Sequence, residues 1–302
     1  MGVKLGVNLP QAGHYDLARD VAEAARRLEE IGYDSLWAYE RLLVPGPRGR
    51  PRDPAAYGST ADPLIVLAMA AAVTSRAELG TGVLVAPLQV PLRLAKTLAT
   101  LDSAAGGRLL AGLGSGWLRD EFDAVGLRPF AERGAALDEF LAVAHAVWGP
   151  DNVEFTGDRY RIGPATIGPK PARPIPVYLA GTTPATFRRI ARRADGWIPF
   201  GISPALVAEG LDQIRELAVA AGRRPEDIQV VHQLGVTSLA EVPAHGREPY
   251  RGSPSQLVED IAELVAGGVG HVYVTVATAT RDVKELLDRA AELHEAVRGA
   301  GL

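Results

Sequence analysis

Short apolar runs alternate with helical patterns along the whole of this 302-residue chain. The first run covers residues 3–9, and apolar residues recur at helical spacing in the stretch after it: Leu17, Val21, Ala24, Leu28 and Ile31. Seven more runs follow in the same manner, over residues 35–39, 78–88, 108–114, 176–181, 196–200, 228–236 and 271–276. Continuous apolar character is typical of strands buried on both faces of a parallel sheet. Eight such units in a chain of this length predict an α/β fold, a closed (β/α)8 TIM barrel.

The domain organisation follows from the same pattern. A doubly wound open sheet is the alternative that eight strand–helix units also allow. No linker or change of composition divides the chain, so we expect one barrel domain over residues 1–302. The irregular part over about 149–174 reads as an insertion, and "VEFTGDRYRI" within it predicts a β-hairpin that turns at Gly157–Asp158.

Charge and cysteine usage narrow the class of protein. The net charge is −4 and the isoelectric point is near 5.9, which argues against a broad surface for nucleic acid or anionic membranes. The chain has no cysteine, so disulfides and thiolate chemistry are excluded and a reducing cytoplasm is expected. The N-terminal "MGVKLGVNLPQAG" lacks the apolar core of a signal peptide, and no apolar run reaches membrane-spanning length.

Two turns after predicted strands have the composition of anion-binding loops. Reacting groups of such barrels come from the loops at the carboxyl ends of the strands. Gly114, Ser115 and Gly116 end the fourth strand, whereas the fifth is followed by Gly181, Thr182, Thr183 and Pro184. Backbone N–H groups at a helix N-terminus, with hydroxyl groups beside them, bind phosphate. The alternative is that the glycines only permit tight turns and the threonine only caps a helix.

Several common site motifs are missing. "GLGSG" lacks the third glycine of the dinucleotide-binding fingerprint and the lysine of a phosphate-binding P-loop. No serine stands in the strand–turn–helix pattern of a hydrolase nucleophile. The six histidines lie in different elements without metal-ligand spacing, so no metal site is expected. His14 and His232 are the better catalytic candidates because they fall near strand ends.

Four ordered blocks carry a family resemblance. "YDSLWAYERLLVP", "LGTGVLVAPLQVPLRLAKTLATLD", "GGRLLAGLGSGWLRDEFDAVG" and "PVYLAGTTPATFRRIARRADGWIP" resemble the luciferase-like monooxygenase superfamily, and most of all its branch that uses the deazaflavin coenzyme F420. The resemblance implies a bacterial-luciferase-like barrel with the cofactor at its mouth. It places a non-prolyl cis peptide behind the cofactor ring at Gly82–Val83. It assigns the phosphate to the fourth- and fifth-strand turns: Gly114, Ser115, Gly116, Ala180, Gly181, Thr182 and Thr183.

The chain departs from its relatives after the second strand. Glu40 and Arg41 stand where many deazaflavin relatives carry an Asp-His pair. Glu40 is a candidate proton donor, or it holds Arg41; Arg41 stays charged and could stabilise a reduced ring or bind an anion. The alternative is a plain Glu40–Arg41 salt bridge. Trp117 replaces the catalytic glutamate of the family's glucose-6-phosphate dehydrogenases, which counts against sugar-phosphate oxidation.

Aromatic and cationic residues near the strand ends give further expectations. Trp37 lies within the second strand and is expected in the core, whereas Tyr39, Trp117 and Phe200 follow strands and could form a cofactor wall. The loop "PGPRGRPRDP", residues 45–54, is either solvated or a lid that meets the acidic tail of the deazaflavin.

The sequence therefore predicts a cytoplasmic, homodimeric oxidoreductase that moves hydride between F420 and a small organic substrate. Glu40 is the first choice for handling the proton, with Arg41 beside it and His14 in reserve. A reduced-FMN monooxygenase of the same fold and a non-catalytic flavin- or deazaflavin-binding protein are the alternatives. No nucleic acid, membrane or metal partner is expected.

Overall fold

The computed structural model describes residues 2–45, 59–236, 238–243 and 245–302. Most of the cationic loop over residues 45–54 lies outside these ranges, so its expected role as a lid stays a prediction. In the described part of the chain, no helix combines the length and the apolar character that crossing a membrane requires.

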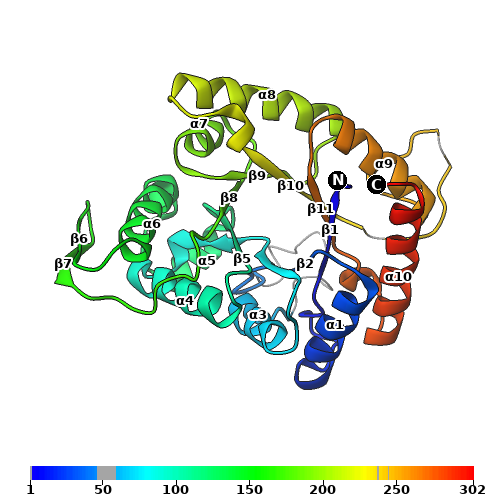
Figure 1. Cartoon of the computed structure of the whole chain (residues 1–302), viewed down its shortest axis with the longest axis horizontal. Helices are drawn as coiled ribbons and strands as arrows, with labels where there is room; N and C mark the ends of the chain where they lie inside the picture. The colour runs from blue at the N-terminus through cyan, green and yellow to red at the C-terminus, as the bar shows by residue number, and fades with distance from the viewer. Residues whose placement is uncertain (1, 46–58, 237, 244) are drawn as a thin grey trace.

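Parallel strands close into a barrel, as the sequence predicts (Figure 1). The order runs from β3 through β2 and β1 to β11, and continues through β10, β9 and β8 to β5, which pairs again with β3. That last pairing closes the sheet and excludes the doubly wound open sheet. The strands are β1 (Lys4–Asn8), β2 (Ser35–Ala38), β3 (Glu78–Thr81), β5 (Leu109–Gly114), β8 (Val177–Ala180), β9 (Gly196–Ile198), β10 (Gln229–Leu234) and β11 (His271–Val274).

The third expected strand is interrupted in the middle. β3 ends at Thr81, and β4 (Leu84–Val85) continues beside β5 before the short 3-10 turn η1 (Ala86–Leu88). The peptide bond between Gly82 and Val83, in the interruption, is cis. The apolar run over 78–88 predicted one strand, whereas the cis peptide at this break was implied only by the family resemblance.

Helices follow the strands and cover the outside of the barrel (Figure 1). Many begin at a proline, whose fixed φ and missing N–H suit the first helical position. Ser203 and Ser253 cap two of them, and Ser253 forms a capping box with Gln256. The helices are α1 (Leu17–Ile31), α3 (Pro63–Ala71), α4 (Pro91–Ala104), α5 (Arg119–Val125), α6 (Arg133–Trp148), α7 (Pro184–Arg193), α8 (Pro204–Ala220), α9 (Pro254–Ala266) and α10 (Val283–Gly299).

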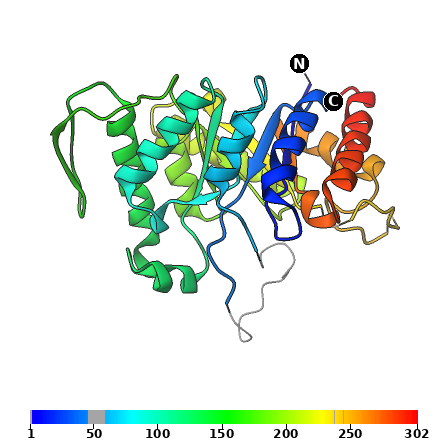
Figure 2. The ribbon, with the colours of Figure 1, turned by 90° about the horizontal axis from the view of Figure 1, so that it is seen from below.

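The predicted hairpin is present and projects away from the barrel beside α6 (Figures 1 and 2). β6 (Val153–Thr156) and β7 (Arg161–Ala165) pair antiparallel. The buried Glu139 of α6 accepts hydrogen bonds from the N–H groups of Arg159 and Tyr160, at 2.8 and 3.2 Å. This carboxylate therefore fastens the turn of the hairpin to the barrel.

Apolar side chains form two separate cores. The larger one lies between the strands and the surrounding helices. The smaller one fills the barrel itself and consists of Trp37, Leu110, Tyr178, Ile198, Val231 and Tyr273. Trp37 stacks on Tyr273 with ring centroids 4.4 Å apart and is 1% exposed, which confirms its predicted place in the core.

Candidate active site

The carboxyl ends of the barrel strands face one end of the molecule, which we call the mouth. The two termini meet at the opposite end, where Arg298 donates hydrogen bonds to the carbonyl oxygens of Val3 and Leu302 at 2.8 and 2.9 Å. The chain after β2 leaves the barrel at the end opposite the two termini (Figure 2). Because loops after the strands supply the reacting groups of such barrels, the mouth is the place to look for a site.

The two glycine turns named from the sequence are neighbours at the mouth. β5 and β8 pair in parallel, and their last registered pair is Leu113 with Leu179. Gly114 and Ala180 come next on the two strands, so the turns that follow begin side by side. Val83 and Ala180 are half-buried and pack on the core inside the barrel. This part of the mouth thus combines an apolar floor, formed by Val83 and Ala180, with two polar turns.

The two turns differ in the helix that follows. α7 has ten residues and starts directly after Thr183, whose side chain accepts a hydrogen bond from the N–H of Thr186 at 3.2 Å. α5 has only seven residues, and its first turn carries Asp120 and Glu121. Negative charges at a helix N-terminus oppose a bound anion. The geometry therefore favours the turn at α7 for a phosphate and leaves the half-buried Ser115 as the polar group of the other turn.

Gly116 has a reason within the protein for lacking a side chain. Its φ is +79°, and a Cβ there would lie 2.8 Å from the Phe122 ring and 2.7 Å from Val85. At Gly181 φ is +121° and a Cβ would approach Thr186 Oγ1 at 3.1 Å. These glycines are thus required by local packing and backbone geometry, whether or not a ligand approaches them.

Glu40 holds the interruption between β3 and β4 in place. Its N–H donates to Val83 O at 3.2 Å, and its carboxylate accepts from Val85 N at 2.5 Å and from Gln89 Nε2 at 2.8 Å. From the other side, the Tyr273 hydroxyl lies 3.4 Å from Gly82 O. The backbone beside the apolar floor is therefore held by Glu40, which follows β2, and by Tyr273 of β11, while Gln89 orients the Glu40 carboxylate.

The surroundings of Glu40 favour its protonated form. The residue is 7% exposed, and this burial raises the pKa of its carboxyl to about 7. The charges of Asp62 and Glu121 add to the rise, whereas the hydrogen bonds from Val85 and Gln89 oppose it. A carboxyl that titrates near neutral pH can both release and accept a proton there.

Among the described residues Arg41 forms an ion pair with Glu121 and none with Glu40, so the alternative of a plain Glu40–Arg41 salt bridge is wrong. Arg41 Nη1 lies 3.0 Å from Glu121 Oε1, and the Arg41 guanidinium lies 4.8 Å from the centre of the Trp117 ring. The Glu121 carboxylate also accepts the N–H of Leu42 at 2.9 Å. Glu121 is 2% exposed and ties the chain after β2 to α5. Nothing in the sequence pointed to Glu121, because Arg41 and Glu121 are 80 positions apart and no local pattern links them.

The two candidate histidines are in different surroundings. His14 is exposed on the loop between β1 and α1, with its ring 4.1 Å from that of Tyr15. His232 is fully buried: its Nδ1 donates to Pro199 O at 3.0 Å, and its Nε2 has no hydrogen-bond partner in the described residues. Burial lowers the pKa of His232 to about 4. The expectation that His232 lies at the site is wrong, because its side chain points from β10 toward the helices.

Two further side chains reach the mouth from β9 and β10. Phe200, named from the sequence as a wall residue, is 54% exposed. Beyond the end of β9, its backbone pairs in parallel with the backbone of Gln233. Gln233 is two residues beyond Val231, which points into the barrel, and it pairs in register with Tyr273. Counting alternate residues from Val231 would have placed Gln233 on the inner face. Trp117 is 67% exposed, and the Arg41 guanidinium lies over its ring.

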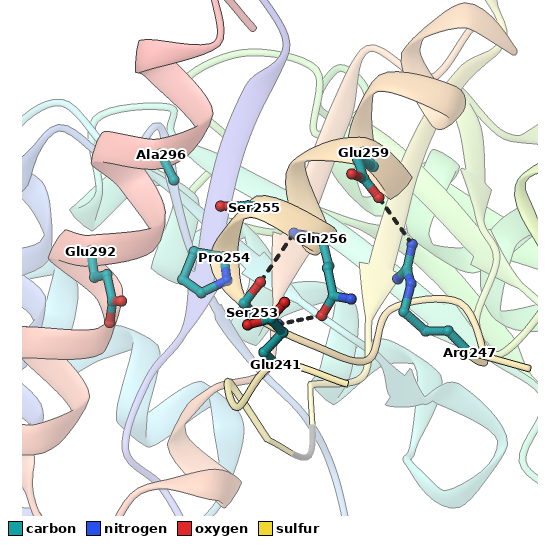
Figure 3. Close-up of a pocket in the computed structure, with 9 residues that line it drawn as sticks. All are labelled: Glu241, Arg247, Ser253, Pro254, Ser255, Gln256, Glu259, Glu292 and Ala296. Atoms are coloured by element: carbon teal, nitrogen blue, oxygen red, sulfur yellow. Dashed lines mark hydrogen bonds and ion pairs between the residues drawn. The ribbon is translucent and has the colours of Figure 1, made fainter. Parts of the chain in front are cut away.

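A separate pocket of about 720 Å³ lies on the outer surface at α9 and α10 (Figure 3). It shares no residue with the mouth. Polar groups on its wall already bind one another: Gln256 accepts from Ser253 N at 3.0 Å, and Arg247 pairs with Glu259 at 3.6 Å. These contacts fasten the loop before α9, and we assign the pocket no part in the site.

Comparison with known proteins adds family information to this geometry. The profile described as luciferase-like monooxygenase matches residues 1–295. An uncharacterized protein of Mycobacterium tuberculosis is 35% identical over 216 residues, which cover 67% of this chain and 74% of that protein. The F420-dependent glucose-6-phosphate dehydrogenase of Amycolatopsis mediterranei is 33% identical over 215 residues, covering 70% of this chain and 62% of that enzyme.

A solved structure shows the same fold. The monooxygenase RslO1 from Streptomyces bottropensis superposes with a TM-score of 0.81, over 99% of this chain and 100% of that chain. The two sequences are 23% identical, so the match speaks for the architecture and not for the reaction.

Proposed function

The chain belongs to the luciferase-like monooxygenase family, and from that premise we propose that it is an oxidoreductase that uses coenzyme F420. The observation that carries the proposal is the pair of turns side by side at the ends of β5 and β8, next to an apolar floor. The similarity to an F420-dependent dehydrogenase supports this cofactor. When bound, F420 supplies a carbon centre that gives or takes hydride, while the protein provides position and a proton.

The residues present fit such a cofactor. The N-terminus of α7, with Gly181, Thr182 and Thr183, offers backbone N–H groups and hydroxyls to a phosphate. Ser115 adds a hydroxyl from the neighbouring turn. The floor formed by Val83 and Ala180 suits the face of an aromatic ring. Gly82, Gly114 and Gly116 keep the backbone around this floor free of side chains.

Glu40 is our proposed proton carrier, because its carboxyl titrates near neutral pH beside the floor. The positive charge of Arg41 would favour negative charge that develops nearby. Glu121 and the Trp117 ring hold the Arg41 guanidinium in place. His14, exposed on the first loop, is the reserve candidate. The substrate is a small molecule; we further propose a cytoplasmic homodimer and one barrel domain over residues 1–302, with about 149–174 as an insertion.

Cofactor titration tests the proposal. Purified protein is titrated with F420 and, separately, with FMN, and quenching of tryptophan fluorescence is followed. We expect the Kd for F420 to be at least about tenfold lower than that for FMN, a difference of about 1.4 kcal/mol. Tighter binding of FMN would overturn F420 as the cofactor and favour the reduced-FMN monooxygenase. Tight F420 binding without turnover of any ketone, enone or alcohol would instead favour the cofactor-binding protein.

A further inference from the structure

The part of the mouth formed by β9 and β10 presents uncharged side chains. Phe200 and Gln233 sit at adjacent strand ends, joined by the bridge that continues the parallel pairing. Gln233 N donates to Pro199 O at 3.3 Å, which holds the two backbones together. One residue offers an aromatic ring and the other a neutral carboxamide.

The Phe200 ring is held in place by its neighbour. A Cβ on Gly235 would lie 3.1 Å from the ring, so the ring lies across this glycine and uses the space that its missing side chain leaves. The ring nevertheless remains 54% exposed. Large exposed aromatic residues at the carboxyl ends of barrel strands are suited to cover the flat face of a ligand.

The Gln233 carboxamide is open to a ligand. It is half-buried and makes no hydrogen bond to another residue that the structure describes. Tyr273 lies beside Gln233 in the sheet register, and its hydroxyl donates a hydrogen bond to Gly82 O at 3.4 Å. A carboxamide has two N–H donors and a carbonyl acceptor, so it can bind either a carbonyl or a hydroxyl oxygen.

We propose that the reacting part of the substrate is an uncharged organic group: a flat ketone or enone, or the alcohol that its reduction gives. Its face lies on Phe200 and its oxygen binds the Gln233 carboxamide. This inference rests on the proposed function, since it names the substrate class of the same mouth. An ionised group placed between this ring and this amide would lose its hydration without gaining an opposite charge from either residue.

Binding of small probes tests the inference. The protein, with and without F420, is titrated with cyclohex-2-enone, cyclohexanecarboxylate and glucose 6-phosphate, and ligand-observed NMR gives each Kd. Gln233→Leu removes the amide and Phe200→Ala removes the ring. Val219→Ala is the matched control, because Val219 is a similarly exposed apolar residue near the other end of α8.

We expect the wild-type protein to bind the enone more tightly than either anion. Gln233→Leu and Phe200→Ala should each raise the Kd of the enone by about tenfold, the scale of one lost hydrogen bond or ring contact. Val219→Ala should match the wild type, and the Kd for F420 should stay unchanged in Gln233→Leu and Val219→Ala. An enone Kd that neither variant alters, or a preference for glucose 6-phosphate, overturns the inference.

The two proposals can fail separately. Wild-type protein that does not bind F420 contradicts the proposed function, whatever the probes show. In that case the same probes on the cofactor-free protein still decide whether the neutral wall binds an enone. Normal F420 binding together with a preference for an anion contradicts only the substrate class.

Discussion

Glu40 accepts hydrogen bonds from the backbone N–H of Val85 in β4 and from the side chain of Gln89, while burial raises the pKa of its carboxyl from 4.5 to about 7. The folded state therefore holds this proton more firmly than the unfolded chain does. The contribution of the protonated Glu40 carboxyl to the free energy of unfolding is complete below pH 4.5 and is lost as the pH rises to 7. At 1.36 kcal/mol per pKa unit, the loss is roughly 3 kcal/mol in the free energy of unfolding.

Glu40→Gln should remove this part of the pH dependence. Urea unfolding at pH 5, 6, 7 and 8 measures it, and the wild-type protein should lose stability over this range more steeply than the variant. Glu226→Gln, at an exposed carboxylate, is the control and should follow the wild type. An unchanged slope in Glu40→Gln would show that this carboxyl does not titrate where we place it.

The Arg41–Glu121 ion pair predicts a strong coupling between two residues distant in sequence. Glu121 is buried, so removing Arg41 leaves an unpaired charge, and Arg41→Met should cost about 3–5 kcal/mol in the free energy of unfolding. Glu121→Gln alone should also destabilise. The double variant should be more stable than the sum of the two losses predicts.

A double-mutant cycle by chemical denaturation checks this, and additive losses would contradict the pair. Arg41→Glu should destabilise more than Arg41→Met, because charge reversal would place two carboxylates together in a buried position.

At the scale of elements, two adjacent threonines at the start of α7 should have separable roles. Thr183 caps the helix, whereas Thr182 is exposed and precedes the cap. Thr183→Val should therefore lower the free energy of unfolding by about 1 kcal/mol. Thr182→Val should leave stability unchanged and weaken F420 binding severalfold, through loss of a hydroxyl at the proposed phosphate.

Thermal unfolding and F420 titration of both variants measure the two effects. Thr182→Val also tests the choice between the two turns. If it binds F420 normally while Ser115→Ala does not, the phosphate lies at the turn after β5 instead.

At the scale of the whole molecule, the barrel brings its two ends together. A Cβ on Gly2 would lie 2.9 Å from the carbonyl carbon of Leu302, and Arg298 also pairs with Asp34 at 2.6 Å. A short linker could therefore join residues 302 and 2 without moving a strand. A circular permutant with new ends in the hairpin turn, between Asp158 and Arg159, should fold and keep its F420 affinity.

Circular dichroism and F420 titration check the permutant. A second permutant opened within β5, between Gly112 and Leu113, is the control and should fail to fold, because it breaks a strand with neighbours on both sides. Loss of structure in the hairpin permutant would show that the end-to-end connection matters more than the barrel contacts suggest.

The sequence by itself determined the elements and their order. Apolar runs and helical spacing depend on near neighbours, so the strands, the helix from Pro184 to Arg193 and the hairpin could be predicted from local patterns. The same patterns placed the glycine turns at strand ends and Trp37 in the core. The four sequence blocks added the family and the cis peptide at Gly82–Val83.

Only the tertiary structure decided which groups meet. Closure of the barrel joins β3 to β5, and it brings Glu121 to Arg41 and Gln89 to Glu40 across long stretches of chain. It also turns His232 away from the mouth and Gln233 toward it, because adjacent residues of a strand point to opposite faces. Side-chain partners and burial depend on these long-range contacts, which no local pattern records.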